Sequence, residues 1–80
     1  MRIDKFLKVS RIIKRRTVAN DVCSSMRVFV NNNPAKPARQ LKVGDVISIE
    51  YKSEIKSYEV LIIPEGNVAV QAADSLYREV

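Results

Sequence analysis

Residues 2–26 read RIDKFLKVSRIIKRRTVANDVCSSM, and this stretch decides how the chain folds. Residues 2–13 fit an amphipathic helix, because Ile3, Phe6 and Leu7 fall on one side at about 100° per residue. The other side is charged, with Arg2 at its border, and carries Asp4, Lys5, Lys8 and Arg11. The pattern weakens towards Ile13, so we expect a turn or break at residues 10–14.

A second helix is predicted directly after this break. Thr17 fits its N-cap position, because a threonine hydroxyl can accept a hydrogen bond from the free amides of the first turn. One face of this helix is apolar and holds Val18, Ala19, Val22, Cys23 and Met26. The opposite face holds Asn20, Asp21, Ser24 and Ser25. The apolar face needs a partner, and the sheet predicted next supplies it.

The middle of the chain predicts short strands. The sequence RVFV at 27–30 has the β-branched and aromatic content of a strand, with Phe29 partly exposed between inward-facing valines. Asn31-Asn32-Asn33-Pro34 predicts a turn, because asparagine tolerates left-handed backbone and proline ends the hydrogen-bonded ladder. Residues 35–42 read as a basic loop, and Val43-Gly44-Asp45 as a second turn.

Residues 46–51 and 55–63 predict a β-hairpin. Alternation places Ile47, Ile49 and Tyr51 on one face of the first strand, and Tyr58, Val60 and Ile62 on one face of the second. Pro64-Glu65-Gly66-Asn67 interrupts the pattern. Residues 71–79 fit a short helix with Ala72, Leu76 and Val80 in register.

The predicted fold is therefore α+β in a single domain over residues 1–80. Two N-terminal helices pack on a small, twisted, mostly antiparallel sheet, with a possible short C-terminal helix. Residues 1–50 form the core, and residues 51–80 the hairpin and tail. There is no stretch of ~18 apolar residues and no apolar leader, so we expect a cytoplasmic protein without membrane contact.

Composition argues against most catalytic and metal chemistry. The chain of 80 residues has no histidine and a single cysteine, Cys23, which rules out a histidine-based triad and a zinc site of the usual type. Its glycines, Gly44 and Gly66, stand too far apart for a phosphate-cradling loop. We therefore expect no enzyme activity and no cofactor, and a core role for the Cys23 thiol.

Charge is divided sharply along the chain. Residues 1–42 hold eleven of the fourteen Lys and Arg and two acids, a net charge of +9. Residues 43–80 hold three basic and seven acidic residues, a net charge of −4, so that the two parts sum to +5. A basic end of this kind typically meets a phosphate backbone.

Four blocks resemble a known module: Arg2-Ile3-Asp4-Lys5-Phe6-Leu7, Arg16-Thr17-Val18-Ala19, Val28-Phe29-Val30-Asn31 and Lys42-Val43-Gly44-Asp45. Their order and spacing resemble the RNA-binding domain named for small-subunit ribosomal protein S-four. Met26 stands where that family usually has glycine, so the second helix is expected to end differently here. Asn31-Asn32 replaces the usual Asn-Gly, and Asn32 can take the left-handed conformation at modest cost.

Among free-standing members, the chain is most similar to the bacterial ribosome-associated quality-control factors P (RqcP), of which heat-shock protein fifteen is a relative. This resemblance implies binding to large-subunit rRNA and peptidyl-tRNA on large ribosomal subunits left by split, stalled ribosomes. It also implies an RqcH-type tail-elongating factor as a partner, which adds alanines to the stranded nascent chain. We expect a monomer.

The residues predicted to bind RNA are mostly cations of the helices and of their connection. They are Arg2, Lys5, Lys8, Arg11, Lys14, Arg15, Arg16, Arg27, Asn31 and Lys36. Arg16 and then Arg2 are the leading candidates, because arginine binds phosphate bidentately and Arg16 opens the second helix. Asp4 and Thr17 are assigned supporting roles, and Asp4 is expected to orient Arg15 or Arg16.

Three other readings stay open at this point. The chain could act as a ribosome-recycling factor of the heat-shock-protein-fifteen type. It could be a DNA-binding module with a helix-turn-helix-like pair. Finally, its basic face could meet an acidic protein partner.

Overall fold

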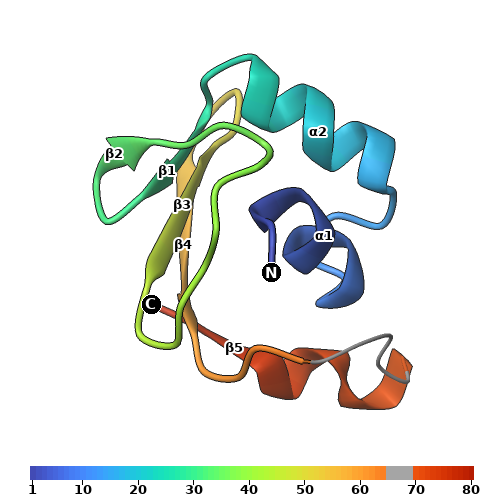
Figure 1. The fold of residues 1–80 in the computed structure, drawn as a ribbon. Coiled ribbons are helices and arrows are strands. Elements are labelled where there is room, and N and C mark those ends of the chain that lie inside the picture. The colour runs from blue at the N-terminus through green and yellow to red at the C-terminus, as the bar shows by residue number, and fades with distance from the viewer. Residues whose placement is uncertain (65–69) are drawn as a thin grey trace.

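The computed structural model describes residues 1–64 and 70–80, without the side chains of Arg16, Val70 and Gln71. Within this part, helices α1 and α2 lie on one side of a five-stranded antiparallel sheet with the order β2-β1-β3-β4-β5 (Figure 1). The bounds are α1 Ile3–Val9, α2 Arg16–Ser24, β1 Val28–Val30, β2 Asn33–Pro34, β3 Val46–Glu50, β4 Ile55–Val60, the 3₁₀ helix η1 Val70–Leu76 and β5 Tyr77–Glu79. The predicted α+β class is confirmed.

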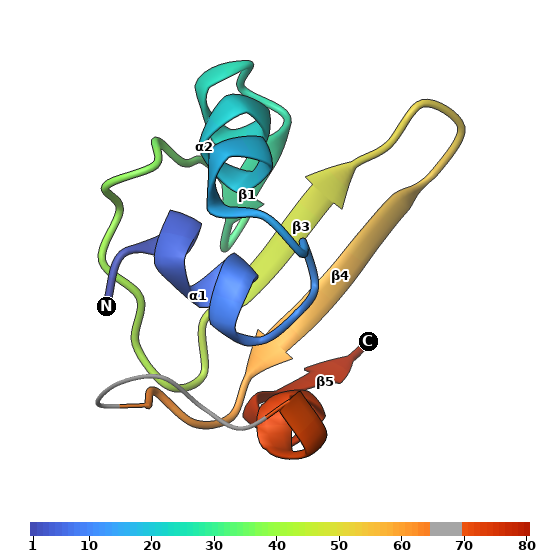
Figure 2. The same cartoon turned by 90° about the vertical axis from the view of Figure 1, so that its right-hand side faces the viewer.

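Helix α1 lies at the centre of the core. Ile3, Phe6 and Leu7 are fully buried, and Figure 2 shows α1 in front of the sheet beside α2. Its N-cap residue, Arg2, makes no side-chain capping bond. Instead the loop after β2 runs along it, and the N–H groups of Ile3 and Asp4 donate to the carbonyls of Arg39 (2.8 Å) and Pro37 (3.3 Å). The loop thereby satisfies the amides that a helix start leaves unpaired.

The predicted break between the helices is confirmed. Helix α1 ends at Val9, and Arg11 has a left-handed φ of 66°. The Ile13 N–H then donates back to the Leu7 carbonyl at 3.0 Å, which draws the connection against the core. Ile12 and Ile13 are partly buried there.

The prediction that Thr17 caps α2 is wrong. Arg15 is the N-cap residue, with extended backbone (φ −122°, ψ 133°) and no side-chain capping bond. Its carbonyl accepts the first helical bond from the Ala19 N–H at 3.0 Å. The helix therefore begins two residues earlier than predicted, and Thr17 lies inside its first turn. Ala19 and Cys23 are buried, as their place on the apolar face predicts.

Helix α2 ends in the arrangement that usually requires glycine. The Met26 N–H donates to the Cys23 carbonyl (3.0 Å) and the Arg27 N–H to the Val22 carbonyl (3.4 Å), which is the Schellman pattern. Met26 takes the left-handed position itself, with φ 62°. The expectation of a different helix end is thus wrong. Met26 also leaves the predicted apolar face and is 65% exposed.

The turn after β1 is confirmed, and it is tighter than predicted. Asn31 and Asn32 both have positive φ (51° and 69°), as a two-residue hairpin turn of type I′ demands. The ladder continues beyond it, because Phe29 pairs with Pro34 and Val30 with Asn33. The assignment of Asn33 and Pro34 to the turn is therefore wrong. An edge strand tolerates proline, since the missing N–H would face outwards.

The hairpin of β3 and β4 is confirmed, with Ile47 opposite Tyr58 and Ser48 opposite Ser57. Strand β4 ends at Val60, whereas alternation predicted a strand to residue 63. The chain turns here because the N–H groups of Leu61 and Ile62 both donate to the Leu76 carbonyl (2.8 and 3.2 Å). Ile62 is consequently exposed, against the prediction.

The C-terminal segment differs most from expectation. The predicted helix is the 3₁₀ helix η1, and Tyr77–Glu79 continue as β5 beside β4. Ala73 and Leu76 are buried, while Val80 is exposed, so the predicted register holds only at Leu76. Tyr77 packs edge-on against Tyr58, with ring centroids 5.3 Å apart. The predicted break at Glu65, Gly66 and Asn67 lies outside the described residues.

Replacing Met26 by glycine should stabilise the fold. Left-handed backbone costs a residue with a Cβ about 1–2 kcal/mol, and the added chain entropy of glycine costs ~0.5–1 kcal/mol. Met26→Gly is therefore expected to raise the free energy of unfolding, measured by urea denaturation, by about 0.5–1 kcal/mol. Met26→Ala, which keeps the Cβ, is the control. A glycine variant less stable than the alanine variant would contradict the strain argument.

Candidate nucleic-acid interface

Asp4 joins α1 to α2 through a buried carboxylate. Its side chain is 2% exposed. Its Oδ2 accepts hydrogen bonds from Arg2 (3.0 Å) and from the Asn20 side-chain amide (3.4 Å), and its Oδ1 accepts from the Lys5 N–H (2.8 Å). The prediction that placed Asp4 on the outer, charged side of α1 is wrong. A buried carboxylate is stable only with such partners around it.

Arg2 is held at the surface by this carboxylate. Its guanidinium is 43% exposed while forming the ion pair with Asp4. Together with Thr17 and Asn20 of α2, Arg2 and Asp4 line a hollow of about 290 Å³ at the junction of the helices. Asp4 therefore positions Arg2, and the role predicted for Asp4 in orienting Arg15 or Arg16 stays a prediction. One predicted cation and both predicted supporting residues meet here.

The other cations of the first 16 residues follow the path from α1 to α2. Lys5 and Lys8 are half-buried on α1, and Arg11, Lys14 and Arg15 are exposed along the connection. Arg16 is the first residue of α2, and its side chain lies outside the described part of the structure. In Figure 2 this α1–connection–α2 unit lies on the side of the sheet that faces the viewer.

Arg27 and Asn31 are placed apart from the helix junction. Arg27 follows α2, and its Nε donates to the Ser25 hydroxyl at 3.0 Å. The Asn31 side chain forms internal bonds, donating to Asp45 (3.1 Å) and accepting from the Val46 N–H (3.0 Å). These bonds fix the β1–β2 turn to the start of β3, a structural task that the sequence did not reveal.

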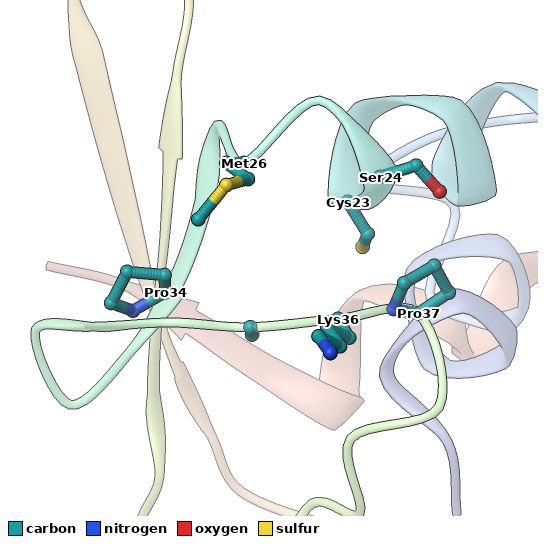
Figure 3. A pocket seen from close by; sticks show the side chains of 7 residues that line it. Cys23, Ser24, Met26, Pro34, Lys36 and Pro37 are labelled. Carbon is teal, nitrogen blue, oxygen red and sulfur yellow. The ribbon is translucent and has the colours of Figure 1, made fainter.

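Lys36 lies in a separate hollow of about 460 Å³ between α2 and the segment after β2. Figure 3 shows Lys36 and Pro37 on that segment, opposite Cys23 and Ser24, with Met26 and Pro34 towards the other end. Most of the lining side chains are apolar. Lys36 is therefore exposed near α2 but does not share the Arg2 hollow.

The Cys23 thiol belongs to the core, as predicted, and is 1% exposed. Burial, and secondarily the charge of Asp4, raises its pKa from 9.0 to about 11. The thiol is therefore protonated at neutral pH and a poor nucleophile. Burial likewise raises the pKa of Tyr58 to about 12, with a smaller contribution from the nearby Tyr51.

The contact of Asn20 with Asp4 was missed by sequence reasoning, whereas Arg39 and Lys42 lie exposed in the loop that was predicted to be basic. Asn20 reaches Asp4 across 16 positions of the chain, and its place on a polar helix face gave no sign of this. Within the described residues, no three His, Cys, Asp or Glu side chains come together as a metal site would need. None of the described helices has the length and apolar character required to cross a membrane.

Comparison with known proteins gives consistent results. The model of the S4 domain family matches residues 1–47. A protein of Helicobacter pylori J99 named RQC P-site tRNA stabilizing factor is 47% identical over 64 residues, covering 80% of this chain and 76% of that protein. One of the same name from Halalkalibacterium halodurans is 44% identical over 78 residues, covering 98% and 88%.

Solved structures agree with the fold. Heat shock protein 15 of Vibrio cholerae, described as trimeric, superposes with a TM-score of 0.88 at 28% identity, covering all of this chain and 81% of that one. The solution structure of a hypothetical protein superposes with a TM-score of 0.85 at 37% identity, covering all of this chain and 96% of that one.

Removing the charge of Asp4 should loosen the junction of the helices. Asp4→Asn weakens the hydrogen bonds from Arg2 and from the Lys5 N–H, because the acceptor is no longer charged. It also places a neutral amide, in place of a carboxylate, beside the Arg2 guanidinium. We expect the free energy of unfolding to fall by about 1–3 kcal/mol in urea titration. Asp21→Asn, on the exposed side of α2, should change it by less than ~0.5 kcal/mol. Equal effects of the two variants would speak against the Asp4 junction.

Cys23 should make stability depend on alkaline pH. The pKa of the Cys23 thiol is higher in the folded chain than in the unfolded one. Its contribution to the free energy of unfolding is therefore complete below pH ~9 and is lost as pH rises towards 11. Cys23→Ala lacks this titration and leaves a small cavity. The variant should be less stable than the wild type at pH 7, with a gap that narrows between pH 9 and 11 in urea titrations. A gap independent of pH would refute the assignment.

Proposed function

The chain belongs to the S4 domain family and, within it, to the RQC P-site tRNA stabilizing factors, and from this premise we propose that it binds peptidyl-tRNA and large-subunit rRNA. The bound particle is the large ribosomal subunit that remains after a stalled ribosome has split. The observation that carries the proposal is the high identity to named relatives over nearly the whole chain. The basic surface around the helix junction supports it.

The physics of phosphate binding favours the α1–α2 side. RNA helices hide the base edges of their major groove, so a protein meets mainly backbone, shape and 2′-hydroxyl groups. Arg2 presents a planar guanidinium whose position is fixed by Asp4, which lowers the entropy lost on binding a phosphate. Lys5, Lys8, Arg11, Lys14, Arg15 and Arg16 extend the charge along the same unit. Release of counterions from the RNA then supplies much of the affinity.

The finer parts of the role belong to the same proposal. The protein acts without catalysis, as a monomer in the cytoplasm, by holding the peptidyl-tRNA while an RqcH-type factor adds alanines to the nascent chain. Arg27, Asn31 and Lys36 extend the surface beyond the helix junction. A recycling role of the heat-shock-protein-fifteen type is less favoured. A heat shock protein 15 homolog of Haemophilus influenzae is only 28% identical to this chain, and the match covers 60% of that protein.

The variant Arg2→Ala tests whether the basic surface at the helix junction binds RNA. With structured RNA in filter binding, the wild type should lose affinity with salt, and Arg2→Ala should bind several-fold more weakly with a log–log slope shallower by about 0.7–0.9. Arg78→Ala is the matched control, because it removes one positive charge from β5, in the acidic part of the chain. Arg2→Lys, which keeps the charge, should retain the slope. Equal losses for Arg2→Ala and Arg78→Ala would contradict the proposed surface.

Sedimentation in sucrose gradients tests whether the protein binds large ribosomal subunits that carry peptidyl-tRNA. The tagged wild type should migrate with free large subunits that carry peptidyl-tRNA, and Arg2→Ala should shift towards the top. Arg78→Ala should migrate like the wild type. A wild type found only at the top of the gradient would overturn the proposal.

A further inference from the structure

A second, apolar groove lies on a different face of α2 from the hollow that Arg2 lines. It has a volume of about 250 Å³ and is bordered by three parts of the chain. Ile12 and Ile13 come from the α1–α2 connection, Val18, Val22 and Arg27 from α2 and its exit, and Ile49, Glu50 and Tyr51 from the end of β3. Figure 2 shows the β3–β4 hairpin extending past the connection and α2 at this end of the molecule.

Resting on the proposed function, we propose that this groove takes one unpaired base of the bound RNA, stacked on Tyr51, with Arg27 at the adjoining phosphate. Tyr51 is 39% exposed, so part of its side chain is open to a ligand. Its backbone is fixed at the end of β3, where the Tyr51 N–H donates to the Glu54 carbonyl at 2.7 Å. Aromatic side chains held in this way are typical platforms for splayed-out bases of RNA loops.

The size of the groove favours a base over a protein segment. Pockets for drug-sized ligands span ~300–1,000 Å³, and this groove is smaller. A docking helix would need a row of apolar contacts at i, i+3, i+4 and i+7, which extends well beyond such a groove. A single planar base with its apolar faces fits the short apolar lining.

Charge at the rim favours a nucleotide. Arg27 is exposed at one side, and its Nε bond to Ser25 holds the guanidinium beside the groove. Ile12 and Ile13 belong to the connection that carries Arg11, Lys14 and Arg15, all exposed. The groove is therefore continuous with the basic surface proposed to bind the RNA backbone. Glu50 is the acid in the lining, and it can accept a hydrogen bond from an amino group of the base.

The groove gives the protein a preference between RNA forms. Phosphate contacts alone bind a paired duplex as readily as a loop, because both carry the same backbone charge. A stacked base adds affinity only where the RNA has an unpaired nucleotide to offer. We therefore infer that loops or bulges, in preference to uninterrupted duplex, are the RNA elements recognised here.

The test compares a hairpin RNA that carries 2-aminopurine in its loop with a blunt duplex of equal length, at matched salt. Base stacking is worth a factor of about ten in affinity. Tyr51→Ala should bind the hairpin roughly tenfold more weakly and the duplex unchanged, while Tyr51→Phe, which keeps the ring, should match the wild type. The wild type should quench 2-aminopurine fluorescence on binding, and Tyr51→Ala should not.

Ile55→Ala is the matched control for losing an exposed apolar side chain on the same hairpin. Ile55 is 63% exposed and lies outside the groove lining, so this variant should bind both RNAs like the wild type. Unchanged hairpin binding and quenching by Tyr51→Ala would overturn the inference and leave the proposed function standing. A wild type that binds neither RNA in a salt-dependent way would overturn both.

Discussion

The buried carboxylate of Asp4 is the constraint on which the rest of this structure depends. It lies between α1 and α2, and a charge in that place must be surrounded by donors. Arg2, the Lys5 N–H and the Asn20 amide supply them. Each donor comes with a geometric consequence: Arg2 is pulled to the helix junction, the first turn of α1 is fixed, and α2 is tied to α1. The Asp4 carboxylate thus determines both how the two helices pack and where the Arg2 guanidinium lies.

The loop after β2 also stabilises the first turn of α1, which Asp4 fixes through the Lys5 N–H. Helix α1 has only seven residues, too few to be stable alone. Burial of Ile3, Phe6 and Leu7 stabilises it, and the carbonyls of residues 37 and 39 satisfy its first amides. Lys36, Arg39 and Lys42 belong to this same loop. The basic residues of the loop are therefore brought to the helices by the bonds that make the short helix possible.

Features set by local chemistry were predictable from the sequence, and features set by distant partners were not. The periodicity of Ile3, Phe6 and Leu7, the presence of a turn after β1 and the alternation of β3 each depend on neighbouring residues, and each was predicted correctly. The burial of Asp4 depends on Asn20, sixteen positions away. The end of β4 depends on the Leu76 carbonyl. Thr17 has the chemistry of a cap, but α2 already begins at Arg16, and Arg15 with its extended backbone is the N-cap residue.

Affinity and selectivity have different sources in this architecture. In the proposed function, the cations of the α1–connection–α2 unit bind phosphate groups, which every RNA element carries, so these contacts alone do not select one element over another. Choice requires a contact that only some elements can offer. An aromatic ring, a cation and an apolar hollow lie together at the end of the β3–β4 hairpin. There Tyr51 lines one groove with Arg27 and with Ile12 and Ile13 of the α1–α2 connection.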